Sequence, residues 1–495
     1  MASFQNIPNN TNPTWWKDSS LRRNVFYTFG CMLCPFYLGY DQSLLTGLQA
    51  MPSWNTYFNS PSGQWLGIIS AAIFLPGIVM GFPAAWMCNV WGRKWCILVG
   101  CVFIIAGAVW NALARTAVEF LVSRIVMGIG GGLTKTSAPV LLQEIAHPRL
   151  RPALSTMYYG CYYIGSLISA IMCIIGLNVP NNWGWRFPCL LAFVGPAAVI
   201  LILLGGPESP RFLVKRGRRA DALSILAKYH ANGDADDALV LWEYREIQSA
   251  IEQEGDSNKT SYMDFFKTKG NRKRLFVSIA IAIGVNWVGN GVVSYYLSPV
   301  LKSIGITNST HILSVNAGLA AWNLLVSELA ALNIDLLSRR ALFLTSTSGM
   351  ILAYAIVMAL SATFSQTNNA STGIAAIPFL FIFFGFYDLA WTTLNYSYCA
   401  EIMPFGLRAK GMAVYLSVQQ LANTFNQFVN PIALEGIGWR YYAVYVVVDC
   451  VYLVIIYLFF PETRGLAIEE VAAVFDDDTL EREDEKVSSE HVEVK

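Results

Sequence analysis

The chain has 495 residues, of which 55% are hydrophobic and only 14% are charged. Soluble domains carry about 25% charged residues, so this composition excludes an ordinary soluble protein and predicts an all-α membrane protein. The net charge of +1 gives no electrostatic basis for binding nucleic acid. The four histidines form no cluster and no nucleophile–base set is evident, so we expect neither an enzyme nor a metal site nor a cofactor.

Twelve segments are apolar and long enough to cross the hydrocarbon core, which takes about 20 residues. They lie at 25–45, 64–88, 95–113, 118–142, 153–178, 187–206, 275–301, 311–334, 341–362, 374–399, 409–432 and 440–460. The sequence therefore predicts two bundles of six transmembrane helices, residues 25–206 and 275–460. A hydrophilic linker with short helical patterns, 207–274, separates the bundles, and polar tails occupy 1–24 and 461–495.

The distribution of Lys and Arg sets the expected orientation. The linker alone holds thirteen of these residues, whereas the loops on the opposite side hold only Arg115, Arg186, Lys302 and Arg440. Since basic loops stay in the cytoplasm, we expect the linker and both termini to be cytoplasmic. Asn308 and Asn369 begin N-x-S/T sequences in loops on the outer side, where they would accept glycans.

A charged motif occurs twice, 257 residues apart. Glu144-Ile145 is followed after four residues by Leu150-Arg151, and Glu401-Ile402 is followed after four residues by Leu407-Arg408. Each copy follows a basic turn, Gly92-Arg93-Lys94 or Ser338-Arg339-Arg340. Repeated halves that rock around a shared site are typical of secondary transporters. We expect two sets of ion pairs that gate the inner side, Arg93, Glu144, Arg151 and Glu208 in one half, and Arg339, Arg340, Glu401 and Arg408 with Asp335 or Glu462 in the other. The alternative is that these charges are solvated loops.

Several polar residues fall inside the apolar segments, where they are costly and usually functional. Gln419, Asn423, Asn426 and Asn430 recur at i, i+4, i+7 and i+11, which places them on one helix face. Amides donate and accept hydrogen bonds as sugar hydroxyls do, and the chain offers further candidates of this kind at Asn286, Asn290 and Asn323. Flat aromatic faces for a sugar ring are expected from Tyr295, Tyr396, Trp287 and Trp391, although aromatic packing is the alternative.

Lys135 has two interpretations. It either extends into the cavity and binds a carboxylate, which favours an organic acid as substrate, or it reaches toward the cytoplasmic surface. Glu328, Asp388 and Asp449 also lie within spans, and the sequence gives no role for Glu328 or Asp449.

A set of motifs in a fixed order covers almost the whole chain. They are Gly39-Tyr40-Asp41, Gly92-Arg93-Lys94, Arg124 with Gly128, Gly130, Gly131 and Gly132, Pro139 and Glu144, Pro207-Glu208-Ser209-Pro210-Arg211, and Pro461-Glu462-Thr463-Arg464-Gly465. With these motifs the chain resembles the sugar porter family of the major facilitator superfamily. Gly289-Asn290-Gly291 and Tyr387-Asp388-Leu389-Ala390-Trp391 are most similar to its fungal lactose-permease-like branch. Tyr159 and Val285-Asn286-Trp287 depart from the family pattern at ligand positions.

The resemblance implies the major facilitator fold, transport driven by the proton gradient, and the plasma membrane as the default location for this branch. We expect the protein to be a monomer. The resemblance also implies that Arg124 faces Asp41 and that this pair couples protons, the alternative being a static buried ion pair. The expected function is proton-coupled symport of a mono- or disaccharide by alternating access, with Tyr159 among the substrate ligands. The alternative is a proton-driven transporter of a polar or acidic small metabolite, in either direction, and a non-transporting nutrient receptor is a third reading.

Overall fold

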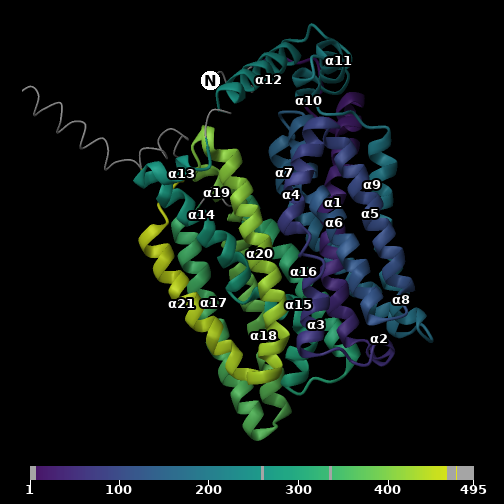
Figure 1. The fold of residues 1–495 in the computed structure, drawn as a ribbon, viewed down its shortest axis with the longest axis vertical. Helices are drawn as coiled ribbons and strands as arrows, with labels where there is room; N and C mark the ends of the chain where they lie inside the picture. The colour runs from purple at the N-terminus through teal and green to yellow at the C-terminus, as the bar shows by residue number, and fades with distance from the viewer. Residues whose placement is uncertain (1–6, 258–260, 334–336, 465–474, 476–495) are drawn as a thin grey trace, which may run out of the picture.

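The computed structural model describes residues 7–257, 261–333, 337–464 and 475, and all regular structure in this part of the chain is helical. Two groups of long helices stand side by side, one from each half of the chain, with short helices at one end (Figure 1). This arrangement agrees with the predicted all-α fold of two bundles joined by a helical linker. Most of the expected acidic tail lies outside the described residues.

The N-terminal group begins with a short 3-10 turn, η2 (Trp15–Lys17), ahead of its first long helix. Its helices are α1 (Ser19–Ala50), α2 (Pro52–Tyr57), α3 (Gly63–Ala71), α4 (Gly77–Val90), α5 (Arg93–Leu113), α6 (Ala117–Ile145), α7 (Arg151–Leu177), α8 (Trp183–Leu191) and α9 (Val194–Leu204). The linker holds α10 (Pro210–Lys215), α11 (Arg219–His230), α12 (Ala238–Ser257) and α13 (Asp264–Lys267).

The C-terminal group follows the same plan. Its helices are α14 (Lys269–Trp287), α15 (Asn290–Ser303), α16 (Ser309–Asn333), α17 (Arg339–Thr367), α18 (Ala370–Tyr387), the π-helical η4 (Asp388–Thr392), α19 (Asn395–Ile402), α20 (Phe405–Ile437), the 3-10 turn η5 (Gly438–Arg440) and α21 (Tyr441–Phe459).

Two helices begin earlier than the predicted spans because a polar side chain caps each start. Asp18 accepts hydrogen bonds from the backbone N–H groups of Ser20 and Leu21, so α1 begins at Ser19 and not near residue 25. Thr268 accepts from the N–H of Asn271, so α14 begins at Lys269, within the segment assigned to the linker. Both extra turns extend the long helices beyond their apolar stretch.

Nine helical stretches of the described residues are long and apolar enough to cross a membrane. They include ten of the predicted spans, because the stretch Gly406–Phe459 joins the last two. The first two predicted spans are not among them: α1 is comparatively polar, and α3 and α4 are separated near Pro76. Large apolar side chains such as Leu201, Leu352 and Val447 are exposed on the helices, as expected for surfaces that face lipid.

The two bundles meet along matching helix pairs. α7 packs against α16, and α20 packs against α3 and α4. In the predicted order of spans, the fifth packs against the eighth and the eleventh against the second. The two contacts are therefore equivalent positions in the two halves. Within the N-terminal group, α1 and α7 touch backbone to backbone, since a Cβ on Gly39 would lie 1.8 Å from the carbonyl oxygen of Tyr162. The bundles also meet where α1 packs against α15 and α16.

Candidate functional site

A buried ion pair lies within the N-terminal bundle. Arg124 on α6 approaches the Asp41 carboxylate on α1 at 3.4 Å and donates a second hydrogen bond to the carbonyl of Ile69 at 3.0 Å. The exposed fractions of the two side chains are only 2% and 5%. The structure therefore brings together the two residues predicted to couple protons, in an environment where breaking their pair is costly.

Polar side chains connect the two bundles. Lys135 on α6 donates to the side-chain oxygens of Gln419 and Gln420 on α20, at 3.4 and 3.1 Å. Tyr163 on α7 donates to Asp388 in η4 at 2.7 Å. Lys135 thus contacts amides of the opposite bundle and has no carboxylate partner among the described residues.

Gln419 is the centre of a polar group on the C-terminal side. Its side-chain oxygen accepts from Tyr396 at 3.2 Å, its amide donates to Tyr415 at 3.3 Å, and its backbone carbonyl accepts from Asn286 at 3.2 Å. Three predicted ligands, Asn286, Tyr396 and Gln419, therefore lie together and next to Lys135. Their hydroxyl and amide groups suit recognition of a polyhydroxylated solute.

The predicted amide face of α20 divides between two environments. Asn423 lies beside Tyr295 and accepts a hydrogen bond from Gln427 at 3.2 Å. Asn426 and Asn430 instead bond each other and the hydroxyls of two tyrosines on α21, Tyr441 and Tyr445. The tyrosines occupy the hydrogen-bonding capacity of these last two amides, because α20 packs against α21 there. Gln419 and Asn423 are the members of the set with contacts outside this network.

Two further predicted amides are only partly satisfied. Asn290 donates to Tyr387 at 2.9 Å, but its side-chain oxygen is buried without a hydrogen-bond partner among the described residues. The same holds for the side-chain oxygen of Asn323 on α16. Buried acceptors of this kind leave capacity for a solute hydroxyl. The side chain of Tyr159 lies outside the part of the structure that is described.

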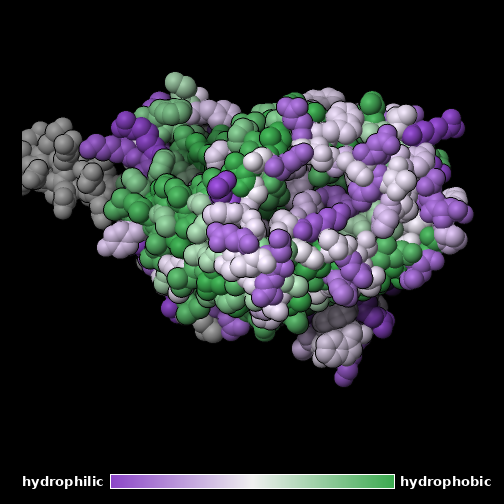
Figure 2. Space-filling model, turned by 90° about the horizontal axis from the view of Figure 1, so that it is seen from below, coloured by the Kyte–Doolittle hydropathy of each residue, from purple (hydrophilic) through white to green (hydrophobic). Residues whose placement is uncertain are grey.

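A pocket of about 680 Å3 lies between the bundles at the end of the molecule opposite the linker. It is lined by the end of α1, the start of α3, the end of α15 and the end of α20, with Lys302 and Glu435 as its charged residues. Figure 2 looks onto this end and shows hydrophilic side chains gathered across the middle of the face. Asn308 and Asn369 are both exposed, and each accepts a backbone hydrogen bond at a helix start.

At the linker end of the N-terminal bundle, three of the predicted gate residues meet. Arg93 at the start of α5 pairs with Glu144 at the end of α6 at 3.0 Å. Glu208 accepts from the backbone N–H groups of Arg93 and Lys94, so its carboxylate lies against the positive end of the α5 dipole. Burial nevertheless raises the pKa of Glu208, and these backbone donors oppose the rise.

The C-terminal bundle repeats this arrangement. Arg339 at the start of α17 lies 3.7 Å from Glu401 at the end of α19, and Glu462 accepts from the N–H groups of Arg339 and Arg340. Although burial by itself raises the pKa of Glu462, Ser338 and the backbone donors lower it below its ordinary value. The pairs Arg93–Glu144 and Arg339–Glu401 therefore each lie within one bundle. Asp335, the alternative partner, lies outside the described residues.

The two copies of the repeated motif differ in the contacts of their last residue, which is Arg in both. Arg151 and Arg408 each donate to the carbonyl five residues earlier, at Ala146 and Met403. Arg151 in addition lies 3.6 Å from Glu243 on the linker helix α12, whereas Arg408 has no carboxylate partner among the described residues. The linker thus forms an ion pair with the repeated motif of the N-terminal bundle.

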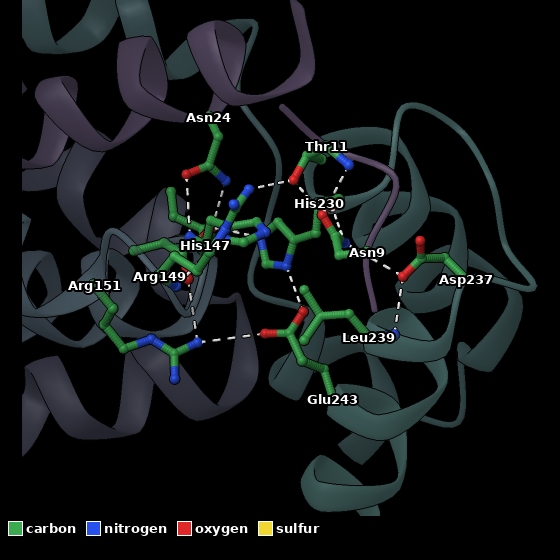
Figure 3. Close-up of polar contacts among 12 residues, drawn as sticks. Asn9, Thr11, Asn24, His147, Arg149, Arg151, His230, Asp237, Leu239 and Glu243 are labelled. Carbon is green, nitrogen blue, oxygen red and sulfur yellow. Dashed lines mark hydrogen bonds and ion pairs between the residues drawn. The ribbon is translucent and has the colours of Figure 1, made fainter. Parts of the chain in front are cut away.

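Glu243 belongs to a group that we call the linker cluster: Asn24, His147, Arg151, His230 and Glu243. All of these are buried except Arg151, whose side chain is 37% exposed. His230 on α11 lies 2.6 Å from Glu243 and 3.0 Å from the carbonyl of Ile145, to which Asn24 also donates at 2.7 Å. Figure 3 shows Arg151 and His230 approaching the Glu243 carboxylate from two sides. The cluster holds α11 and α12 against the ends of α1 and α6.

The pKa values of the two histidines of the linker cluster are shifted in opposite directions. Burial disfavours the charged form of His230, but the Glu243 carboxylate outweighs it and raises the pKa of His230. Burial and the neighbouring His230 lower the pKa of His147 to about 2, so His147 stays neutral. Sequence reasoning missed this cluster because its histidines are 83 residues apart and show no shared motif; the amphipathic pattern of the linker was its only signal.

Comparison with known proteins gives a consistent result. The family described as sugar (and other) transporters matches residues 27–475. The MFS-type transporter criB of Aspergillus cristatus is 26% identical over 467 residues, which cover 93% of this chain and 96% of that protein. Sugar transport protein MST3 of Oryza sativa subsp. japonica is 27% identical over 489 residues, covering 93% of this chain and 92% of that protein.

The fold also matches a solved structure. The major facilitator superfamily proton:xylose symporter XylE of E. coli, bound to 6-bromo-6-deoxy-D-glucose, aligns with a TM-score of 0.73 and 23% identity, covering 92% of this chain and 99% of that one. At this identity the likeness concerns the fold. Since the family match runs from α1 to the residues beyond α21, this chain is an integral membrane transporter, not an enzyme, and belongs to the sugar transporter family of the major facilitator superfamily.

Proposed function

We propose that this protein is a proton-coupled symporter that carries a mono- or disaccharide by alternating access. The observation that carries the proposal is the buried Asp41–Arg124 pair, which lies in the bundle that meets the polar group around Gln419. A carboxylate that trades its arginine for a proton as the helices move gives a site for loading and releasing that proton. XylE, whose fold this chain shares, is named as a proton:xylose symporter, and MST3 as a sugar transport protein.

The proposed substrate site combines residues from both bundles. Gln419, Asn423, Asn286, Asn290, Tyr295, Tyr396 and Asn323 supply its hydroxyl and amide groups, and Tyr159 completes the set in the N-terminal half. The gate residues open and close the linker side, because the partly buried pairs Arg93–Glu144 and Arg339–Glu401 must break for that side to open. We propose twelve crossings, cytoplasmic termini, a plasma-membrane location, glycans on Asn308 and Asn369, a monomeric state, and the proton gradient as the sole energy source.

Uptake by cells that express the protein tests this function. Radiolabelled D-xylose, D-glucose and lactose are supplied at external pH 5.5 and 7.5 while cytoplasmic pH is recorded. We expect at least one sugar to enter faster at the lower pH and to acidify the cytoplasm. Asp41→Asn should lower the acidification that accompanies each sugar. Acidification that persists unchanged in Asp41→Asn contradicts the role of Asp41.

Lys135 favours a second candidate, transport of an acidic metabolite. Its ammonium group contacts only the amides of Gln419 and Gln420 in the described structure, so a substrate carboxylate would be its natural counterion. Competition between the labelled sugars and a panel of mono- and dicarboxylic acids separates the candidates. Transport that acids inhibit and no sugar inhibits would favour the second.

A further inference from the structure

The C-terminal bundle contains a second buried carboxylate at the boundary between the bundles. Asp388 is 0% exposed. One of its oxygens accepts from Tyr163 at 2.7 Å and from Thr392 at 2.6 Å, and the other has no hydrogen-bond partner among the described residues. Unlike Asp41, Asp388 has no ion-pair partner in this part of the chain. An ionised carboxylate left half-satisfied away from water is very costly, whereas a protonated one is neutral.

The backbone is irregular at this residue. Helix α18 ends at Tyr387, and the residues Asp388–Thr392 form the single π turn η4 before α19 begins at Asn395. π turns cost helical hydrogen-bond geometry and occur frequently at functional sites. Here the turn places the Asp388 side chain where it meets α7 of the other bundle. The irregularity and the unsatisfied oxygen are two separate observations at one position.

The groups that face Asp388 carry no charge. Tyr163 and Tyr162 face it from α7, and Tyr387 faces it from α18. Tyr162 is also within electrostatic range of Asp41, so both carboxyl groups lie near this tyrosine.

The charged residues on the other helices packed against η4 make contacts elsewhere. Glu328 on α16 points at Gly160 of α7. On α17, Arg339 faces Glu401, and Arg340 is held by Glu462 through its backbone. On α19, Glu401 accepts from Thr463. The protonation state of Asp388 is therefore set by burial and by the hydroxyl groups of Tyr163 and Thr392.

We propose that Asp388 exchanges a proton during each transport cycle, in addition to Asp41; this inference rests on the proposed proton-coupled function. In the described conformation Asp388 holds the proton. When the bundles rock, Tyr163 withdraws with α7, water reaches the carboxyl group, and the O–H bond breaks with release of the proton to that water. The same bond forms again when Asp388 takes up a proton on the other side. No other bond changes.

The test measures how many protons accompany each sugar. Wild type, Asp388→Asn and Asp449→Asn are reconstituted in liposomes, and the gradient of D-xylose or D-glucose that stops net flux is determined at an imposed pH difference. One proton fewer per sugar lowers this balancing gradient about tenfold for each pH unit. Asp449 is the matched control, because it is 0% exposed in the same bundle, both its oxygens lack partners among the described residues, and it lies on α21, away from α7.

We expect Asp388→Asn to carry one proton fewer than wild type and Asp449→Asn to match wild type. An Asp388→Asn protein that balances at the wild-type gradient overturns the inference and leaves the proposed function intact. If the balancing sugar gradient of the wild type does not depend on the imposed pH difference, the proposed function itself is wrong.

If Asp388→Asn does not transport sugar, infrared spectroscopy of the purified proteins without solute tests the inference instead. The carbonyl stretch of a protonated carboxylic acid should be missing from Asp388→Asn and shifted in Tyr163→Phe, which removes the hydrogen-bond donor. If Asp388→Asn keeps every such band of the wild type, Asp388 is ionised throughout and the inference is wrong.

Discussion

Replacing Glu243 by Gln should release the linker helices from the N-terminal bundle. Glu243 is 6% exposed and neutralises His230 at 2.6 Å and Arg151 at 3.6 Å. Glutamine keeps the shape of the side chain but removes its charge, so two cationic groups lose their counterion. The linker cluster depends on this one carboxylate.

The size of the effect follows from burial. Removing one partner of a buried ion pair costs about 3 kcal/mol, because the other charge is left uncompensated. Since about 1.4 kcal/mol corresponds to a factor of ten, the docked state of α11 and α12 should become roughly 100-fold less favoured.

The effect should depend on pH in a definite direction. The pKa of His230 is raised in the folded protein, so its pairing contributes fully below the ordinary histidine value of about 6.5 and is lost as pH rises through the raised pKa. The difference between wild type and Glu243→Gln is therefore largest in mild acid. The lowered pKa of His147 acts in the opposite sense, since the stability from keeping His147 neutral is lost as pH falls below about 6.5. That loss affects both proteins and cancels in their difference.

Hydrogen–deuterium exchange of the amides in α11 measures the docked fraction. Asp221→Asn is the matched control, because Asp221 lies on the same helix in an exposed pair with Arg218. We expect exchange to accelerate roughly 100-fold in Glu243→Gln at acid pH, with little change in the control. Equal exchange in wild type and Glu243→Gln, or a difference that does not shrink as pH rises, would refute this account of the linker cluster.

Three further predictions follow from individual contacts. Gly289→Ala should lower the melting temperature by several degrees, because φ is +97° and a Cβ would lie 2.2 Å from the Tyr354 ring; Gly233→Ala, with φ +93° and open space, should lower it less. Arg93→Gln should destabilise the protein by about 3 kcal/mol in denaturant unfolding by stranding buried Glu144, whereas Arg218→Gln should have almost no effect. Lys135→Gln should leave sugar uptake within about tenfold of wild type if its ammonium only holds Gln419 and Gln420, and abolish uptake of acids if it binds carboxylates.

Much of the gate could be predicted because its information is local. The spacing of Glu144 and Arg151 recurs at Glu401 and Arg408, and the basic turns recur before them, so a repeat in the sequence indicated a repeat in space. The structure places Arg93 on Glu144 and Arg339 on Glu401, in matching positions. The backbone contacts of Glu208 and Glu462 were not predictable, since they depend on where the chain returns after the sixth and twelfth spans.

The sequence by itself determined the apolar spans, the two halves and the side of the membrane expected for the linker, because hydropathy and charge act residue by residue. Only the tertiary structure decided which polar side chains already form hydrogen bonds with other side chains of the protein. Asn430 follows the same helix face as Gln419, yet it is bonded by Tyr441 and Tyr445, while Gln419 meets Lys135 from the other bundle. The contact of His230 with Ile145 and that of Tyr163 with Asp388 likewise join residues 85 and 225 positions apart. Such pairings arise from the packing of distant helices, which no periodicity within one segment records.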